Sequence, residues 1–447
     1  MSNEFRRGLE QRHVMMLSFG GVIGTGLFLS TGYTLQQAGP VGTVVSYIVG
    51  ALLVYMVMKC LGALAVKHPD VGGFHTYANI YISPSVGHVV AWSYWLCWTI
   101  AIGSEITAGG ILFQKWLPDF PVWLFSLIFI AVIIAINLTS SRIYGEAEFW
   151  LSLVKVLAIV AFILIGLLIL FKVLPSSLEP VTAGEQLFDV PNGLFGIFIT
   201  MLAVNYAFSG TELIAIAAGE TKNPERVIPK TIRATVWRLA LLFIGTIVIM
   251  VLLLPTDQAS LLESPFVSIL DSVGVPYAGD IMNFIILTAL LSAANSGLYA
   301  ASRMLWSLSE QDNILPVAKK LSSKGMPVNA TLISLAGALL SLLSSVIAPT
   351  TVYLVLVSVA GFAVVVVWMS ICLSRINQLK AEGVRKRSAY ILPVTAFTLC
   401  LVSCIGVLFD PNQRLATLIG LPFCLIVWLI HYTLTQKKGD GVHETAR

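Results

Sequence analysis

Long apolar runs separated by short polar segments dominate the chain. A helix that spans a membrane needs about 20 mostly apolar residues, and twelve runs satisfy this requirement. Their expected bounds are 13–36, 41–66, 84–112, 121–139, 148–171, 193–219, 232–254, 279–308, 329–348, 350–374, 390–408 and 414–435. The pattern predicts an all-α polytopic membrane protein with twelve transmembrane helices.

The composition agrees with a chain that lies mostly in lipid. Hydrophobic residues make up 57% of it and charged residues only 11%, whereas soluble proteins carry about 25% charged residues. The net charge of +4 is too small to suggest nucleic-acid binding. All six cysteines fall inside or at the ends of apolar runs, so we expect small buried side chains rather than disulfides or metal ligands.

The distribution of basic residues predicts the orientation. An even number of spans puts both termini on one side. With the N-terminus inside, 23 of the 27 Lys and Arg residues lie on the inner side and three (Lys115, Lys172 and Arg414) lie outside. Because cytoplasmic loops carry the basic excess, we expect a multi-pass protein of the cytoplasmic membrane with cytoplasmic tails, 1–12 and 436–447. The polar, basic N-terminus predicts no cleavable signal peptide, and the short loops predict one transmembrane domain, 13–435.

Two of the predicted spans are interrupted near their middle. Four glycines fall within residues 20–26 of the first span, among them Gly24, and the segment 209–211, centred on Gly210, interrupts the sixth just before Glu212. Each glycine in a helix costs up to about 1 kcal/mol, so these segments are expected to unwind. Close helix packing by small residues is the alternative. Two such helices roughly 185 residues apart favour unwinding.

The spacing of the spans predicts an internal repeat. The second, third and fifth spans correspond to the seventh, eighth and tenth, at offsets of roughly 185–205 residues. Because five is odd, the second set (193–374) enters the membrane with opposite polarity to the first (13–171), and 390–435 adds two helices. Paired interrupted helices in an inverted repeat indicate a secondary transporter. Lipid cannot satisfy the freed backbone groups, but a zwitterionic substrate can.

Five segments together resemble bacterial amino acid permeases of the amino acid–polyamine–organocation (APC) superfamily. They are GGVIGTGLF (20–28), PDVGGFHTYA (69–78), FWLSLVKV (149–156), NYAFSGTELIAIAAGETKNP (205–224) and ANSGLYAASRMLWSLS (294–309). The similarity extends over about 8–435 and looks nearest to the arginine and S-methylmethionine permease branch. It implies a LeuT-type five-plus-five inverted repeat with discontinuous helices 1 and 6, alternating access and proton symport.

The resemblance also implies a substrate site at the first interruption. By position, Val22 would offer its carbonyl group to the ammonium of an amino acid. Thr25 and the N–H group of Gly26 would hold the carboxylate. These assignments assume that the unwound segment aligns with the family pattern without gaps.

The sixth span would complete that site. The resemblance implies that Tyr206 and Ser209 offer carbonyl groups to the substrate ammonium and that Phe208 lies against the substrate as a gate. Glu212 follows the interruption directly. We expect it to accept hydrogen bonds from freed N–H groups and brace the unwound segment, rather than to contact the substrate.

Lys155 is an ionisable residue in the interior of the fifth predicted span. A charge at that depth costs a few kcal/mol or more, so it needs a partner or a purpose. The resemblance places Lys155 where sodium-coupled relatives hold a cation, which an ammonium group can replace. It would then couple transport to protons. The alternative is a permanently charged strut between helices.

Glu105 is an acidic residue in the interior of the third predicted span. Small residues surround it in WTIAIGSEITAGGILF (98–113), which predicts a crowded position facing other helices or a cavity. It could face the cationic side chain of a substrate, carry a proton, or anchor an internal hydrogen-bond network. Related permeases for neutral substrates often have an acid here too, so all three interpretations stay open.

The inner ends of the spans carry one departure from the family pattern. Many relatives have an acid in a GE-type motif at the inner end of the second span, where this chain has Ala63, followed by Lys67. The inner gating network is therefore open to question. Glu220 lies near Lys222 and Arg226, which predicts a solvated ion pair.

These observations predict a secondary active transporter that imports an amino acid by proton symport. The substrate would be cationic: arginine, lysine or S-methylmethionine. An exchanger, a neutral amino acid permease and a sensor that binds without transport are the alternatives. The chain lacks HExxH, GxSxG and GxxxxGK[ST], so neither an enzyme nor an ATP-driven pump is expected. Nor do we expect a cofactor, a metal or an obligatory protein partner besides the amino acid, protons and lipid.

Overall fold

The computed structural model describes residues 10–68, 73–137, 141–178, 180–181, 187–221, 223–259, 263–312, 315–322, 325–345, 347–409 and 413–444. Every regular element in these ranges is a helix, which confirms the all-α prediction. All six cysteines are free thiols and five of them are buried, as expected of small apolar side chains.

Nine helical segments in the described part of the chain are long and apolar enough to cross a membrane. One of them combines α8 with the short α9. The nine are α3 (Ser30–Lys67), α5 (Pro84–Phe113), α7 (Ser141–Leu170), α8 (Gly193–Phe208) with α9 (Leu213–Ile216), α10 (Pro224–Leu253), α12 (Ala278–Asp312), α14 (Pro349–Ala381), α15 (Ser388–Gly406) and α16 (Arg414–Glu444).

The other three predicted spans fall on shorter or interrupted helices. The run 13–36 contains α1 (Gln11–Val22), α2 (Thr25–Phe28) and the start of α3. The run 121–139 contains α6 (Val122–Asn137), and 329–348 contains α13 (Val328–Ser334) and the 3₁₀ segment η4 (Leu335–Ser345). The remaining elements are α4 (Phe74–Tyr81), α11 (Pro265–Asp271), η1 (Ala217–Glu220), η2 (Thr256–Gln258), η3 (Pro316–Lys319) and η5 (Val407–Phe409).

The long α3 contains the boundary that the sequence predicts between the first two spans. Gly39 has a φ of +69° and Pro40 follows it inside the helix. Proline has no N–H group to donate, and its ring clashes with the preceding turn. The Thr43 hydroxyl donates to the Gly39 carbonyl oxygen at 2.7 Å. Two helical segments therefore meet at a kink without an intervening loop.

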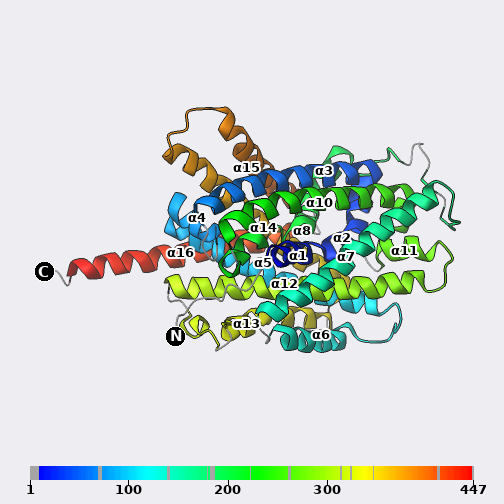
Figure 1. Ribbon diagram of the computed structural model, residues 1–447, viewed down its shortest axis with the longest axis horizontal. Coiled ribbons are helices and arrows are strands. Elements are labelled where there is room, and N and C mark those ends of the chain that lie inside the picture. The colour runs from blue at the N-terminus through cyan, green and yellow to red at the C-terminus, as the bar shows by residue number, and fades with distance from the viewer. Residues whose placement is uncertain are drawn as a thin grey trace.

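The long helices run side by side along the length of the molecule (Figure 1). The short α4 and the C-terminal end of α16 lie at one end of this bundle, and α11 lies at the opposite end. At the centre, α5 contacts α4, α6, α12, α14, α16 and η4. This position removes Glu105 from the lipid-facing surface, and its exposed fraction is 5%.

Glycines bring η4 unusually close to α5. A Cβ atom added at Gly103 would lie 2.7 Å from the carbonyl oxygen of Gly337, and one added at Gly337 would overlap the carbonyl oxygen of Thr99. The two backbones therefore touch without intervening side chains. A run of 3₁₀ helix as long as η4 is uncommon, and this contact shows how tightly it is held.

Gly337→Ala is expected to lower the thermal stability of the detergent-purified protein. The added methyl group would have to push the α5 and η4 backbones apart, and overpacking of this kind costs about 1–3 kcal/mol. Gly62→Ala is the matched control, because its Cβ would meet Ile232 at 3.6 Å, an ordinary contact. Equal unfolding temperatures for the two variants would contradict the close contact.

Candidate functional site

The first helical interruption lies between α1 and α2. Ile23 has an extended backbone, Gly24 adopts φ −144° and ψ −149°, and α2 begins at Thr25. A Cβ at Gly24 would lie 2.7 Å from a carboxylate oxygen of Glu105. Glycine is therefore the residue that lets the α5 carboxylate approach the broken backbone.

Glu105 binds the hydrogen-bond donors that this interruption frees. Its carboxylate oxygens accept from the Thr25 N–H group at 3.1 and 3.2 Å and from the Thr25 hydroxyl at 2.9 Å. The Tyr206 hydroxyl donates to the same carboxylate at 3.2 Å and contacts the Ser104 hydroxyl at 2.9 Å. In this conformation Glu105 acts as the hydrogen-bond anchor of the break.

The second interruption separates α8 from α9 and lies against the first. Gly210 has a φ of +103°, in the region that favours glycine, and a Cβ there would lie 2.7 Å from the backbone carbon of Gly21. Glu212 accepts from the Gly210 N–H group at 3.0 Å, from the Thr211 hydroxyl at 3.4 Å and from the Trp368 indole at 3.4 Å. Through these contacts Glu212 holds the unwound backbone at Gly210 against α14.

The carbonyl groups that the resemblance reserves for a substrate ammonium lie at these breaks. Val22 is the last residue of α1. The Tyr206 carbonyl oxygen already accepts from the Ser209 N–H group at 3.0 Å and from its hydroxyl at 2.7 Å. The contact of Tyr206 with Glu105 is made by its phenolic hydroxyl, which the family pattern did not indicate.

Gly26 and Phe208 serve close packing in this conformation. A Cβ at Gly26 would lie 2.5 Å from the Ala207 Cα atom, so α2 and α8 touch there. The Phe208 ring lies 6.0 Å from that of Tyr47 and 4.9 Å from that of Phe243. The structure thus brings Thr25, Glu105 and Tyr206 together and places Phe208 between α3 and α10.

Lys155 reaches the last turn of α1. Its ammonium group donates to the Gly20 carbonyl oxygen at 2.6 Å, and its side chain is fully buried. A carbonyl oxygen near an unwound helix end lacks its usual helical partner, so the ammonium satisfies an acceptor that lipid could not. This contact links α7 to the segment that precedes the first break.

Glu148 is a second buried acid at this position that the sequence reasoning missed. It lies on α7 with Ser152 and Lys155, at a spacing that places all three on one helical face. Its carboxylate accepts from Asn295 at 3.2 Å, from Ser152 at 3.4 Å and from Ser292. The spacing of Glu148, Ser152 and Lys155 could have indicated this contact. Glu148 directly precedes the segment FWLSLVKV (149–156), on which the family resemblance rests.

Buried acidic side chains outnumber buried basic ones around the two breaks. Glu105, Glu148 and Glu212 are at most 5% exposed, and Lys155 is the buried basic side chain that the structure describes near the breaks. Buried charges are costly unless they are paired. Each of these acids therefore needs hydrogen-bond donors, a cation or a proton beside it. Across the described residues, no group of three or more His, Cys, Asp or Glu side chains is arranged to hold a metal ion.

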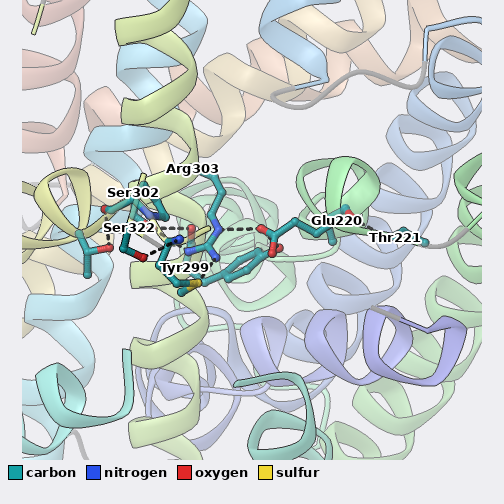
Figure 2. A network of polar contacts seen from close by, with 10 residues as sticks. Glu220, Thr221, Tyr299, Ser302, Arg303 and Ser322 are labelled. Carbon is teal, nitrogen blue, oxygen red and sulfur yellow. Dashed lines mark hydrogen bonds and ion pairs between the residues drawn. The ribbon is translucent and has the colours of Figure 1, made fainter. Parts of the chain in front are cut away.

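Glu220 corrects the expectation of a solvated ion pair. It is 2% exposed, and its carboxylate accepts from the Arg303 guanidinium at 2.9 Å and from the Tyr299 hydroxyl at 2.9 Å (Figure 2). The guanidinium also lies over the Tyr299 ring at 3.8 Å. The partner that the structure describes is thus an arginine of α12, 83 residues away in sequence; Lys222 lies outside the described residues.

Lys67, which follows the Ala63 departure, has an acidic partner on another helix. Its ammonium lies 2.6 Å from Glu382, directly after α14. The hydrogen bond from Lys67 holds the pKa of Glu382 below its ordinary value. Both side chains are exposed, so this pair contributes little to stability.

Comparisons with known proteins identify close relatives. A family model described as amino acid permease matches residues 13–438. A putative histidine permease of Bacillus subtilis (strain 168) is 48% identical, over 96% of this chain and 94% of the relative. The amino-acid permease RocC of the same organism is 43% identical, over 99% and 97%. The lysine-specific permease LysP of Escherichia coli (strain K12) is 36% identical, over 95% and 92%.

Glu212→Ala is expected to destabilise the protein. Removing the carboxylate leaves the Gly210 N–H group and the Trp368 indole buried without an acceptor, and each buried unsatisfied group costs about 1–3 kcal/mol. Thermal unfolding of the detergent-purified protein measures the loss. Glu225→Ala, an exposed acid in the first turn of α10, is the control, and a Glu212 variant as stable as this control would contradict the bracing role.

Proposed function

Since the chain belongs to the amino acid permease family, we propose that it imports an amino acid across the cytoplasmic membrane by proton symport with alternating access. The family and the many apolar helices make it a multi-pass membrane protein of amino acid transport. The observation that carries the finer proposal is the Glu105 carboxylate on Thr25. In this proposal the Glu105 carboxylate occupies the position at the helical break that the carboxylate of a substrate would take.

The proposed topology has twelve spans in a LeuT-type five-plus-five inverted repeat. The segments on α1 and α2, on α6 and on α13 with η4 would complete the nine longer helices. The repeats would cover 13–171 and 193–374, with 390–435 added. The bias of basic residues supports cytoplasmic tails at both ends. One transmembrane domain, 13–435, would then contain the whole transport machinery.

We propose that the substrate enters at the two breaks and displaces Glu105 from Thr25. Thr25 and Gly26 would then hold the substrate carboxylate, because the N–H and hydroxyl groups that bind one carboxylate suit another. Val22, Tyr206 and Ser209 would offer carbonyl groups to the substrate ammonium, and Tyr206 would first have to release Ser209. Phe208 would close on the substrate only after it leaves its packed position.

The excess of buried acids supports a cationic substrate and a coupled proton. An amino acid with a charged side chain would bring positive charge next to Glu105. A proton bound at Lys155, at Glu105 or at both would add further positive charge. Two of the relatives carry the names of histidine and lysine permeases, and both amino acids have basic side chains. Arginine, lysine, histidine and S-methylmethionine are therefore the first substrates to test.

Transport can be tested with the purified protein in liposomes. Labelled arginine, lysine or histidine should exchange into vesicles preloaded with the same unlabelled amino acid. An acidic exterior should drive accumulation above the external concentration. Exchange without accumulation would identify an exchanger, and binding without exchange would identify a sensor. Accumulation of neutral amino acids alone would contradict the proposed cationic substrate.

Lys155→Ala should abolish accumulation driven by a proton gradient while leaving exchange measurable. The substitution removes the group proposed to carry the proton, whereas the breaks that bind the substrate remain. Exchange activity in the same vesicles shows that the variant is folded. Full accumulation by Lys155→Ala would assign coupling to another residue and return Lys155 to the role of a strut.

Glu105→Gln should weaken cationic substrates more than neutral ones. The amide keeps an oxygen that can accept from Thr25 but loses the negative charge. The expected difference in apparent affinity is about tenfold, or about 1.4 kcal/mol. Competition by arginine and by leucine against one labelled substrate measures it. Equal weakening of both competitors would show that Glu105 does not select the charge of the side chain.

A further inference from the structure

Glu148 is a buried carboxylate to which the proposed transport site gives no role. Its exposed fraction is 0%, and it lies on α7 two turns before Lys155. The Ser152 and Ser292 hydroxyls and the Asn295 amide donate to it. A carboxylate can only accept hydrogen bonds, so a set of donors matches its ionised form. Glu148 stands at the start of the fifth predicted span, and a buried ionised acid there needs a partner or a purpose.

Glu148 and Lys155 meet at Gly20 of α1. The Lys155 ammonium donates to the Gly20 carbonyl oxygen at 2.6 Å. A Cβ at Gly20 would overlap a carboxylate oxygen of Glu148, so that oxygen lies directly against the α1 backbone. Long side chains on a helix lean toward its N-terminus, which directs Lys155 toward Glu148. Both side chains thus lie against the same residue of α1, without a direct hydrogen bond or ion pair between them.

Besides Gly20 of α1, the groups around this pair come from three other helices, and most of them are neutral. From α12, Ser292 and Asn295 donate to Glu148. From α6, Asn137 donates in turn to Asn295. From α5, Glu105 interacts electrostatically with Lys155. Glu148 therefore binds Ser152 on the α7 face that carries Lys155 and also lies against Gly20 in the last turn of α1.

Charged groups also mark the end of this α1–α7 contact that we assign to the cytoplasm. His13 of α1 lies 3.1 Å from Glu146 of α7, which also binds Arg12 at 2.6 Å. The Glu146 side chain is 37% exposed. In the proposed topology α7 starts on the cytoplasmic side, so Glu148 lies between Lys155 and the cytoplasm.

We propose that Glu148 receives the transported proton from Lys155 and releases it to the cytoplasm. A water molecule between the two side chains relays the proton. It takes a proton as an N–H bond of the Lys155 ammonium breaks, and it gives a proton to the Glu148 carboxylate as an O–H bond forms there, which leaves a neutral amine, a neutral acid and the water unchanged. The O–H bond then breaks as cytoplasmic water takes the proton. Loss of both charges weakens the hold of α7 on Gly20 and frees α1 to move. This inference rests on the proposed proton symport.

The test compares Glu148→Gln with wild-type protein in liposomes. The amide can still accept a hydrogen bond from Ser292 but cannot take a proton. Exchange of labelled substrate should persist, whereas accumulation driven by an acidic exterior should fall to equal concentrations on both sides. Glu148→Asp, which can still take a proton, should accumulate substrate with a shifted pH dependence. Glu146→Gln on the same helix should behave like wild type.

The outcomes separate this inference from the proposed function. Accumulation by Glu148→Gln at the wild-type level would overturn the role of Glu148 and leave proton symport intact. A wild-type protein that never responds to the proton gradient would overturn symport itself. Should Glu148→Gln fail to fold, infrared spectra of wild type and Glu148→Asp decide. A protonated-carboxyl band that appears on acidification should move in the Asp variant, and an identical band in both would overturn the proposal.

Discussion

Every backbone N–H and C=O group inside a membrane must find a partner within the protein. Two interrupted helices, α1–α2 and α8–α9, expose such groups at the centre of this bundle, and buried side chains satisfy them. Glu105 binds the Thr25 donors, Glu212 binds the Gly210 N–H group, and Lys155 binds the Gly20 carbonyl oxygen. The position of α5, the packing of the glycines and the proximity of the two breaks all depend on these contacts.

The partners are ionisable, and this property connects stability with function. A neutral side chain could satisfy the same backbone groups permanently. A carboxylate or an ammonium can instead be displaced by a substrate of the same charge or released by a proton. Three buried acids and one buried lysine lie near the breaks, so acidic groups outnumber basic ones there. The contacts that hold the helices together are therefore also the contacts that a cationic amino acid and a proton would change.

The sequence predicted the helical class and the positions of both interruptions, because hydrophobic runs and clustered glycines are local signals. It did not reveal that the segment 335–345 is 3₁₀ helix, because close contact with Thr99 and Gly103 controls that segment. The sequence also did not reveal which groups the buried polar side chains bind. Glu220 binds Arg303 of α12, and Phe208 packs between α3 and α10, because tertiary packing decides both.

The central claim is that a substrate carboxylate takes the place of Glu105 at Thr25. The most direct measurement is the thermal stability of the purified protein with each basic amino acid and with its decarboxylated amine. Arginine is paired with agmatine, lysine with cadaverine and histidine with histamine. A ligand that binds only the folded state raises the unfolding temperature. At least one amino acid should raise the unfolding temperature while its decarboxylated amine does not. Equal stabilisation by every amino acid and its paired amine would contradict the account.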